Sequence, residues 1–499
     1  MVRFDLRKNL SRKELCTFVL IILAIVAIVL PISRKIMVLA VETLLNRDLD
    51  NSWWEEKLFT VLLIPLLMVF IYLLNYCLLK ITHNRNIIYA NILFFWVVSN
   101  FFIRLNGNFE GYKVSWDNGD FVDCIKGGYG SGTLYGTNYP PLAVLLFRWL
   151  HQYLLNDDGT ISENAAIYIT NMFVMIVILS LCICFYKLIK EEKSSILFLV
   201  VLFITSPMLF AIQRMNLMLI ALVFSCIFLL TYNSDKRGVR FAGLLSLAIS
   251  ANIKFFPAIY GLILVKEKKW KEAIICAGLG LFLFLAPLLI PKDSPLVTND
   301  YAVCSEESEV NQDETEEIVS EPVSEAVTTS DSSIKKLISS ISEFANSDRT
   351  IGRTLSMQSV VYNILSPLGV SDRVVRVLRY AITILNAIFM IWAFFKTKRR
   401  DYELIILTLF STFLISTSNW YFLIFLIPAF IEFVSTTKLD NRDSVLAVIW
   451  IALLVFRWGF GNVFVLQDWK YVVVLWGYLM VNILLDARQD HYQNKMVVK

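Results

Sequence analysis

The sequence predicts an all-α integral membrane protein that crosses the bilayer about 12–14 times. Three observations support this fold class: the composition, the repeated apolar stretches, and the basic clusters between them. The 499 residues are 57% hydrophobic and 18% charged, whereas soluble domains are about 45–50% apolar and about 25% charged. Mean hydropathy is +0.62. Water therefore cannot be the main solvent of this chain.

Apolar stretches long enough to cross a membrane recur along the sequence. A spanning helix needs about 20 mostly apolar residues, and lipid offers the backbone no other hydrogen-bond partner. The first stretch is interpreted as a retained span, because Pro31-Ile32-Ser33-Arg34 lacks the small-residue pattern of a signal cleavage site. The predicted helices are residues 15–32, 58–79, 87–105, 163–186, 195–212, 216–232, 271–290, 374–395, 401–417, 420–436, 443–459 and 470–486.

Basic residues predict the orientation of the chain, since Lys and Arg accumulate in cytoplasmic loops. The basic N-terminal segment places that end inside the cell. All later basic clusters also fall inside if two apolar segments do not cross completely. We therefore expect a multi-pass cell-membrane protein with both termini in the cytoplasm. The clusters are Lys80 to Arg85, Lys187 to Lys193, Lys236 to Arg240, Lys266 to Lys271, Lys396 to Arg400, Lys438 to Arg442 and the tail from Arg488.

The two exceptional segments differ from ordinary spans. Tyr139 to Leu155 begins Tyr-Pro-Pro-Leu and contains Arg148 and His151, which predicts a juxtamembrane helix at the outer interface. Phe241 to Val265 is interpreted as a broken hairpin of two half-helices, because Pro interrupts helices. The alternative is one kinked span with a basic external loop.

The topology predicts three domains. Residues 1–291 form an N-terminal transmembrane core whose first external loop is 106–162, and residues 374–499 form a C-terminal bundle. Residues 292–373 form an external acidic loop. Its most acidic part, 305–332, has too few apolar residues to build a core and is expected to be disordered.

Polar motifs from distant parts of the chain converge on the outer face in this topology. Taken singly, each has an ordinary explanation: Asp117 or Asp120 could cap a helix, and Arg214 could reach toward lipid head groups. Lys254 is harder to explain, because a cation between apolar half-helices is costly without a polar partner. The motifs are Trp116 to Asp123, Tyr135 to Leu142, Gln213 to Asn216, Asn252 with Lys254, Gln358-Ser359 and Ser416 to Trp420.

A carboxylate and cations beside a membrane suit group transfer from a lipid-linked phosphate. Lys254 or Arg214 could stabilise the phosphate as it leaves, and Asp120 could take the proton of an acceptor hydroxyl. If the carboxylate lies on the face of the sugar opposite the leaving group, one displacement inverts the anomeric centre, by analogy with inverting glycosidases.

These residues give the chain a resemblance to the GT-C superfamily, nearest to glycosyltransferase family 87, which includes enzymes that use polyprenyl-phosphate mannose. The resemblance covers about residues 85–436. The sequence departs from the family pattern at Met215, where Gly often stands, and in the acidic insert. The matching elements are Gly119-Asp-Phe121, Tyr135, Tyr139-Pro-Pro-Leu142, Gln213-Arg-Met-Asn216, Lys254-Phe-Phe-Pro257, Gln358-Ser359 and Ser418-Asn-Trp420.

The resemblance implies a GT-C-like membrane glycosyltransferase that acts on the extracytoplasmic side. It would transfer mannose or another hexose from a polyprenyl-phosphate donor to an envelope glycan or lipid acceptor. Asp120 takes the position of the acidic catalytic residue, with Asp117 as a second catalytic candidate, and Lys254 and Arg214 bind the donor phosphate. The expected substrate-binding residues are Tyr135, Tyr139, Asn216, Gln358, Asn419 and Trp420.

Other functions share some of these features. A flippase for lipid-linked oligosaccharides, or another transporter, would place charges along a transmembrane path, whereas the candidate charges here gather near one face. An envelope polysaccharide polymerase or ligase would share the outer site. No cofactor is predicted and nucleic-acid binding is not indicated. Asp117 and Asp120 could share a divalent ion, but His83, His151 and His491 are too dispersed to form a metal site.

Overall fold

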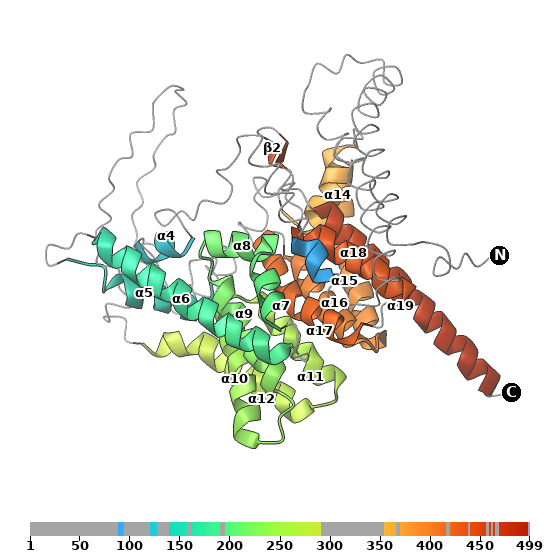
Figure 1. The fold of residues 1–499 in the computed structure, drawn as a ribbon, viewed down its shortest axis with the longest axis horizontal. Coiled ribbons are helices and arrows are strands. Elements are labelled where there is room, and N and C mark those ends of the chain that lie inside the picture. The colour runs from blue at the N-terminus through green and yellow to red at the C-terminus, as the bar shows by residue number, and fades with distance from the viewer. Residues whose placement is uncertain are drawn as a thin grey trace, which may run out of the picture. The chain divides into compact units, whose positions relative to one another are not determined.

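The structure is a computed structural model, and the part of the chain that it describes is helical apart from one small hairpin. The described residues are 88–93, 120–126, 139–156, 161–189, 195–290, 354–365, 370–415, 420–437, 440–455, 459–460, 463–464 and 469–497. The predicted spans 15–32 and 58–79 and the acidic segment 305–332 lie outside these residues. The chain is an all-α membrane protein (Figure 1).

The elements follow one another as α-helices interrupted by short 3₁₀ segments, labelled η. The two strands pair antiparallel, with Gly459 opposite Phe464 and Phe460 opposite Val463. In chain order the elements are α4 (Asp120–Lys126), α5 (Pro141–His151), α6 (Glu163–Leu188), α7 (Ser195–Phe203), α8 (Ser206–Gln213), α9 (Met218–Thr231), α10 (Arg237–Ile253), η4 (Phe256–Gly261), α11 (Leu262–Lys266), α12 (Trp270–Leu285), η5 (Ala286–Leu289), α14 (Met357–Leu365), α15 (Asp372–Lys396), α16 (Arg400–Leu414), η7 (Trp420–Leu426), α17 (Ile427–Thr436), α18 (Asn441–Val455), β1 (Gly459–Phe460), β2 (Val463–Phe464) and α19 (Trp469–Val497).

Three helices within the described residues are long and apolar enough to cross a bilayer. They are Asn164–Leu188 in α6, Asp372–Lys396 in α15 and Val472–Asp490 in α19. Both α6 and α15 expose large apolar side chains along their length, such as Leu179 and Leu385. Lipid is the natural environment for these faces.

Proline explains why several predicted spans are interrupted. The stretch 195–212 was expected as one helix, but it forms α7 and α8, because Pro207 stands in the first turn of α8 and lacks the amide hydrogen that a continuous helix needs. In the same way α12 ends before Pro287, and a 3₁₀ turn follows.

The segment Phe241 to Val265 is the broken hairpin that the sequence predicts. Helix α10 ends at Ile253, Lys254 is extended with φ −144° and ψ 133°, and the chain returns through η4 and α11. Tyr232, just before α10, donates a 2.7 Å hydrogen bond to Glu267, just after α11. Both ends of the hairpin therefore meet at one end of the helix bundle, which the single-span alternative does not allow.

The chain divides into two compact units. Unit 1 comprises residues 1–111, 190–206 and 430–499, and unit 2 comprises residues 112–189 and 207–429. Unit 1 has an aromatic core in which the ring centroids of Tyr89 and Phe198 are 4.7 Å apart and those of Phe430 and Trp450 are 5.3 Å apart. All candidate site residues except those outside the described part fall in unit 2.

The centre of unit 2 is the close packing of α9 on α10. The hydroxyls of Ser225 and Ser250 are 3.0 Å apart, and Ser250 also donates to the carbonyl of Ala221 at 2.6 Å. Small residues let two helix backbones approach in this way, as is common in membrane helix pairs. Gly243 continues the contact at the other end of α9, where a Cβ atom would meet Thr231 Oγ1 and lie 3.1 Å from the backbone nitrogen of Tyr232.

Gly243→Ala is expected to destabilise the protein by about 1–3 kcal/mol, because the added methyl group must push the two helices apart. Gly278→Ala is the matched control. Gly278 lies inside α12 with no atom near the position of a Cβ, so the change should be neutral or stabilising by up to about 1 kcal/mol. Thermal unfolding in detergent measures both, and equal melting temperatures for the two variants would contradict the close approach.

Candidate functional site

Unit 2 has two chemically different ends. At one end, which we call the Tyr232 end, Tyr232 accepts a 3.1 Å hydrogen bond from Arg400 Nη2 and donates one to Glu267. Lys266 Nζ donates to the carbonyl of Thr397 at 2.6 Å and lies 2.8 Å from Glu403. The ends of α9, α11 and α15 and the beginning of α16 therefore meet here.

The opposite end, which we call the Lys254 end, is about 25 Å away. Lys254 follows the 17 residues of α10, and a helix rises 1.5 Å per residue. Arg379 lies 17 residues before the end of α15 at Lys396, so it stands at a similar level. The turn before α9, at Asn216, is also at this end, since α9 runs from there to Tyr232. Two of the sequence-predicted motifs, Asn252 with Lys254 and Gln213 to Asn216, are thus near one level of unit 2, and Arg379 is near the same level.

Lys254 and Tyr139 are brought together directly. The Lys254 ammonium is 3.7 Å from the centre of the Tyr139 ring, a cation–π contact that grows stronger where water is excluded. Tyr139 is buried and packs edge-on against Phe147 of α5, with centroids 5.4 Å apart. Two residues predicted separately therefore form one contact, in which Tyr139 positions the cation.

Asp120 begins α4, and this helix is held against the same aromatic group. Phe121 stacks on Phe173 of α6 with centroids 4.0 Å apart and approaches Phe147 edge-on at 6.3 Å. The other end of α4 is fixed by a 2.7 Å hydrogen bond between His151 Nδ1 and the carbonyl of Ile125. The backbone of Asp120 is therefore next to the cluster that carries Tyr139. Asp117 and Tyr135 lie outside the described residues.

The turn from α8 to α9 carries Arg214, Met215 and Asn216. Met215 is buried with φ +47°, a left-handed conformation that Gly adopts most easily. A glycine at this position would adopt the same conformation without steric cost. Asn216 is also buried, and its Oδ1 accepts a 3.0 Å hydrogen bond from the backbone of Met218. Asn216 thus has a structural role at the beginning of α9.

Arg214 is exposed, and its guanidinium carbon is 5.8 Å from the centre of the Phe210 ring. Phe210 in turn stacks on Tyr421 at 5.9 Å. Tyr421 follows Trp420, the first residue of η7. The Gln-Arg-Met-Asn turn therefore lies near the beginning of η7. Asn419 lies outside the described residues.

Gln358 is paired with a residue that the sequence motifs did not single out. Its Oε1 accepts a 3.1 Å hydrogen bond from Arg379 Nη2 of α15. Arg379 is only 8% exposed. The sequence alone could have pointed to Arg379, because it is an arginine inside the apolar stretch 374–395. A charged residue within a membrane-spanning segment indicates a functional site by default.

Metal ligands do not cluster in the described part of the chain. Within those residues there is no group of three or more His, Cys, Asp or Glu that could hold an ion. A site that used Asp117 would fall outside them.

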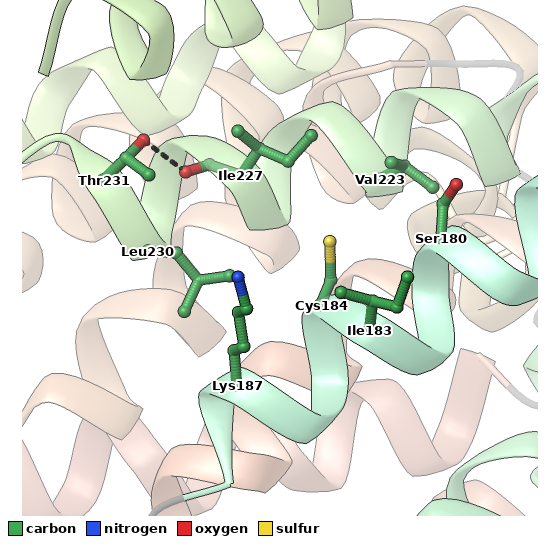
Figure 2. Close-up of a pocket in the computed structure, with 8 residues that line it drawn as sticks. All are labelled: Ser180, Ile183, Cys184, Lys187, Val223, Ile227, Leu230 and Thr231. Carbon is green, nitrogen blue, oxygen red and sulfur yellow. Dashed lines mark hydrogen bonds between the residues drawn. The ribbon is translucent and has the colours of Figure 1, made fainter. Parts of the chain in front are cut away.

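A groove of about 420 Å³ lies between α6 and α9, away from the Lys254 end. Figure 2 shows Ser180, Cys184 and Lys187 of α6 facing Val223, Ile227 and Thr231 of α9. Thr231 Oγ1 donates to the carbonyl of Ile227 at 2.6 Å. The groove is mostly apolar and is next to the Tyr232 end, so it holds none of the predicted site residues.

Electrostatics at the Tyr232 end favour a charged Glu267. Burial raises the pKa of the Glu267 carboxyl, but hydrogen bonds from Lys269 and Tyr232 outweigh it and hold the pKa below its ordinary value. Lys269 Nζ is 2.7 Å from Glu267 Oε2. The Tyr232 hydroxyl donates its hydrogen to Glu267 Oε1 at 2.7 Å.

Glu267→Gln is expected to destabilise the protein by about 1–2 kcal/mol at neutral pH, because a charged acceptor is lost. Since folding lowers this pKa, the contribution is present above the ordinary value near 4.5 and is lost as pH falls through the folded value. The difference in melting temperature from wild type should therefore shrink below about pH 4.5. Asp235→Asn, an exposed change nearby, is the control. A constant difference across pH would contradict this account.

Comparison with known proteins supports the resemblance over part of the chain. Residues 137–299 match the family model of glycosyltransferase family 87. The match includes the Tyr139, Arg214 and Lys254 motifs. No curated protein and no solved structure matches the chain. The predicted resemblance to this family is confirmed for the matched residues, and the match supports a membrane glycosyltransferase.

Proposed function

We propose that this membrane glycosyltransferase transfers mannose or another hexose from a polyprenyl-phosphate donor to an envelope glycan or lipid acceptor. The observation that carries the proposal is the Lys254–Tyr139 contact. It lies inside the segment that matches the glycosyltransferase family, at the end of unit 2 to which the helix of Asp120 is fastened.

The reaction needs three actions from the chain. Asp120 takes the proton from an acceptor hydroxyl, whose oxygen attacks the anomeric carbon. The bond between that carbon and the phosphate oxygen breaks, and polyprenyl phosphate leaves with one more negative charge. Lys254 and Arg214 stabilise this charge as it develops. Attack opposite the leaving group makes the transfer inverting.

The remaining predicted residues bind the substrate or position the side chains that act on it. Tyr139 orients Lys254, while Tyr135 and Trp420 offer aromatic faces for the sugar. Gln358 and Asn419 offer amides for hydroxyl groups, and Asn216 holds the turn that carries Arg214. Asp117 is a second carboxylate close to Asp120 in sequence.

Charge supports an extracytoplasmic site. The loops at the Tyr232 end are rich in basic residues at positions 236–240, 266–271 and 396–400, which is typical of cytoplasmic loops. The Lys254 end then faces the other side of the cell membrane, where lipid-linked sugars replace nucleotide sugars as donors. Both termini remain cytoplasmic in this arrangement.

Donor choice tests this proposal. Purified protein in liposomes is given radiolabelled mannose or glucose, either on polyprenyl phosphate or on a nucleoside diphosphate. We expect transfer to added acceptor glycan only from the lipid-linked sugar. Transfer from the nucleotide sugar would overturn the proposed donor. Movement of a lipid-linked glycan between leaflets without any sugar transfer would favour the flippase instead, and consumption of only long lipid-linked glycans would favour the polymerase or ligase.

A further inference from the structure

Arg379 is a buried charge within a spanning helix. It lies in the third turn of α15, whose 25 residues form one of the three candidate membrane spans. Its side chain is on the inward stripe with Thr383 and Asn386, both buried, while Ile384 and Leu385 face outward and are exposed. The stripe is thus polar on the face that is covered by protein.

The guanidinium has no counter-ion in the part of the chain that the structure describes. Its bond to Gln358 is to a neutral amide, and its Nε is buried without a hydrogen-bond partner there. Among the described residues no carboxylate lies within ion-pair distance of Arg379. A charge buried inside a membrane protein is expensive when its partners are neutral, and neutral Gln358 is the hydrogen-bond partner of Arg379 among the described residues, so an anionic ligand would offset the cost.

The surroundings of Gln358 are polar as well. The hydroxyls of Thr354 and Ser359 are 2.6 Å apart, and Ser356 donates to Ser359 at 3.1 Å. All three residues are buried: Thr354 and Ser356 come just before α14, which packs on α15, and Ser359 lies in its first turn. Arg379 therefore contacts α14 through Gln358, and a cluster of buried hydroxyls lies next to Gln358 in the chain.

We propose that Arg379, oriented by Gln358, binds the phosphate of the polyprenyl-linked donor. A guanidinium presents parallel N–H donors that match two phosphate oxygens, and Nε, which has no hydrogen-bond partner among the described residues, is one such donor. This inference rests on the proposed function and adds to it a cation that the matched family segment, residues 137–299, does not contain. Because the contact exists before and after transfer, Arg379 acts on donor affinity more than on turnover.

The test measures binding to the full chain in lipid nanodiscs, with polyprenyl phosphate that carries no sugar as the probe. Polyprenol and inorganic phosphate are the comparison ligands. Arg379→Gln should weaken binding of polyprenyl phosphate by about 10- to 100-fold, since a hydrogen-bonded charge is removed. Binding of polyprenol should not change. Arg376→Gln, an exposed cation one turn away, should bind like wild type.

Stability separates a binding role from a structural one. Without ligand, Arg379→Gln should melt no lower than wild type, because it removes a buried charge whose partner among the described residues is a neutral amide. It should lose the stabilisation that polyprenyl phosphate gives. A lower melting temperature with unchanged affinity would overturn the proposal. If Arg379→Gln does not fold, Arg379→Lys takes its place, because lysine keeps the positive charge but lacks the paired N–H donors of the guanidinium. Arg379→Lys should bind polyprenyl phosphate more weakly than wild type. Wild-type affinity in that variant would also overturn the proposal.

Further outcomes of the binding and transfer measurements identify the ligand, and they distinguish failure of this inference from failure of the proposed function. Equal binding of inorganic phosphate, lost in Arg379→Gln, would assign the site to free phosphate and reject the lipid. Binding of polyprenyl phosphate through Arg379 by a protein that transfers no sugar would reject the function but keep the site. Sugar transfer with an unchanged KM for the donor in Arg379→Gln would reject the site but keep the function.

Discussion

Asp120→Asn is expected to lower the rate of sugar transfer by about 10²- to 10⁴-fold, the range that general-base catalysis contributes. Asparagine has nearly the same shape but cannot accept a proton at neutral pH. The donor KM should change little, because the proton moves only in the transition state. Initial rates of sugar transfer over a range of donor concentrations measure both quantities.

Asp372→Asn is the matched control for Asp120. Asp372 is an exposed carboxylate in the first turn of α15, at the same end of unit 2, and its replacement should leave the rate within about twofold of wild type. An Asp120→Asn protein that elutes normally and transfers sugar at the wild-type rate would show that another group is the base. Asp117 would then be the next residue to replace.

Lys254→Met is expected to reduce kcat by about 10²- to 10³-fold, similar to the loss of one preorganised group that stabilises developing charge. The methionine side chain has a similar length and keeps contact with the Tyr139 ring, but it carries no charge. Lys254→Arg should recover part of the activity, because a guanidinium can also stack on that ring. Single-turnover rates separate the chemical step from binding.

The control for Lys254 is Arg373→Met, which removes an exposed cation from the beginning of α15. It should transfer sugar at a rate close to that of wild type. Tyr139→Leu tests the contact itself: if the ring positions the ammonium, kcat should fall by a smaller factor than in Lys254→Met. Full activity of both Lys254→Met and Tyr139→Leu would remove this pair from the mechanism.

The sequence predicted those parts of the fold that depend on composition and local chemistry. The basic residues after Val265 and the proline at 257 were enough to predict the broken hairpin, because charge fixes the side of a loop and proline fixes the break. The expectation of one helix over 195–212 was wrong, since hydropathy outweighed the proline at 207. Hydropathy indicates whether a segment prefers lipid or water, but it does not indicate whether the segment forms one unbroken helix.

The site was predictable only where a motif carries its own signal. Lys254 and Tyr139 stood out one by one, but their contact joins residues 115 positions apart (254 − 139) and follows from packing. The pair of Gln358 and Arg379 depends on how α14 lies on α15. The hydrogen bond of Arg400 to Tyr232 joins α16 to the end of α9. Sequence patterns predict where helices lie along the chain, but they do not predict which helices pack against each other.

The most direct test of the central claim is the release of polyprenyl phosphate from synthetic polyprenyl-phosphate mannose or glucose by the purified wild-type protein, followed by mass spectrometry in the presence of an acceptor glycan. The account predicts that polyprenyl phosphate and a glycan one hexose heavier appear in equal amounts, and that neither appears with Asp120→Asn. An intact donor after prolonged incubation with folded wild-type protein, across both sugars and several acceptors, would contradict it.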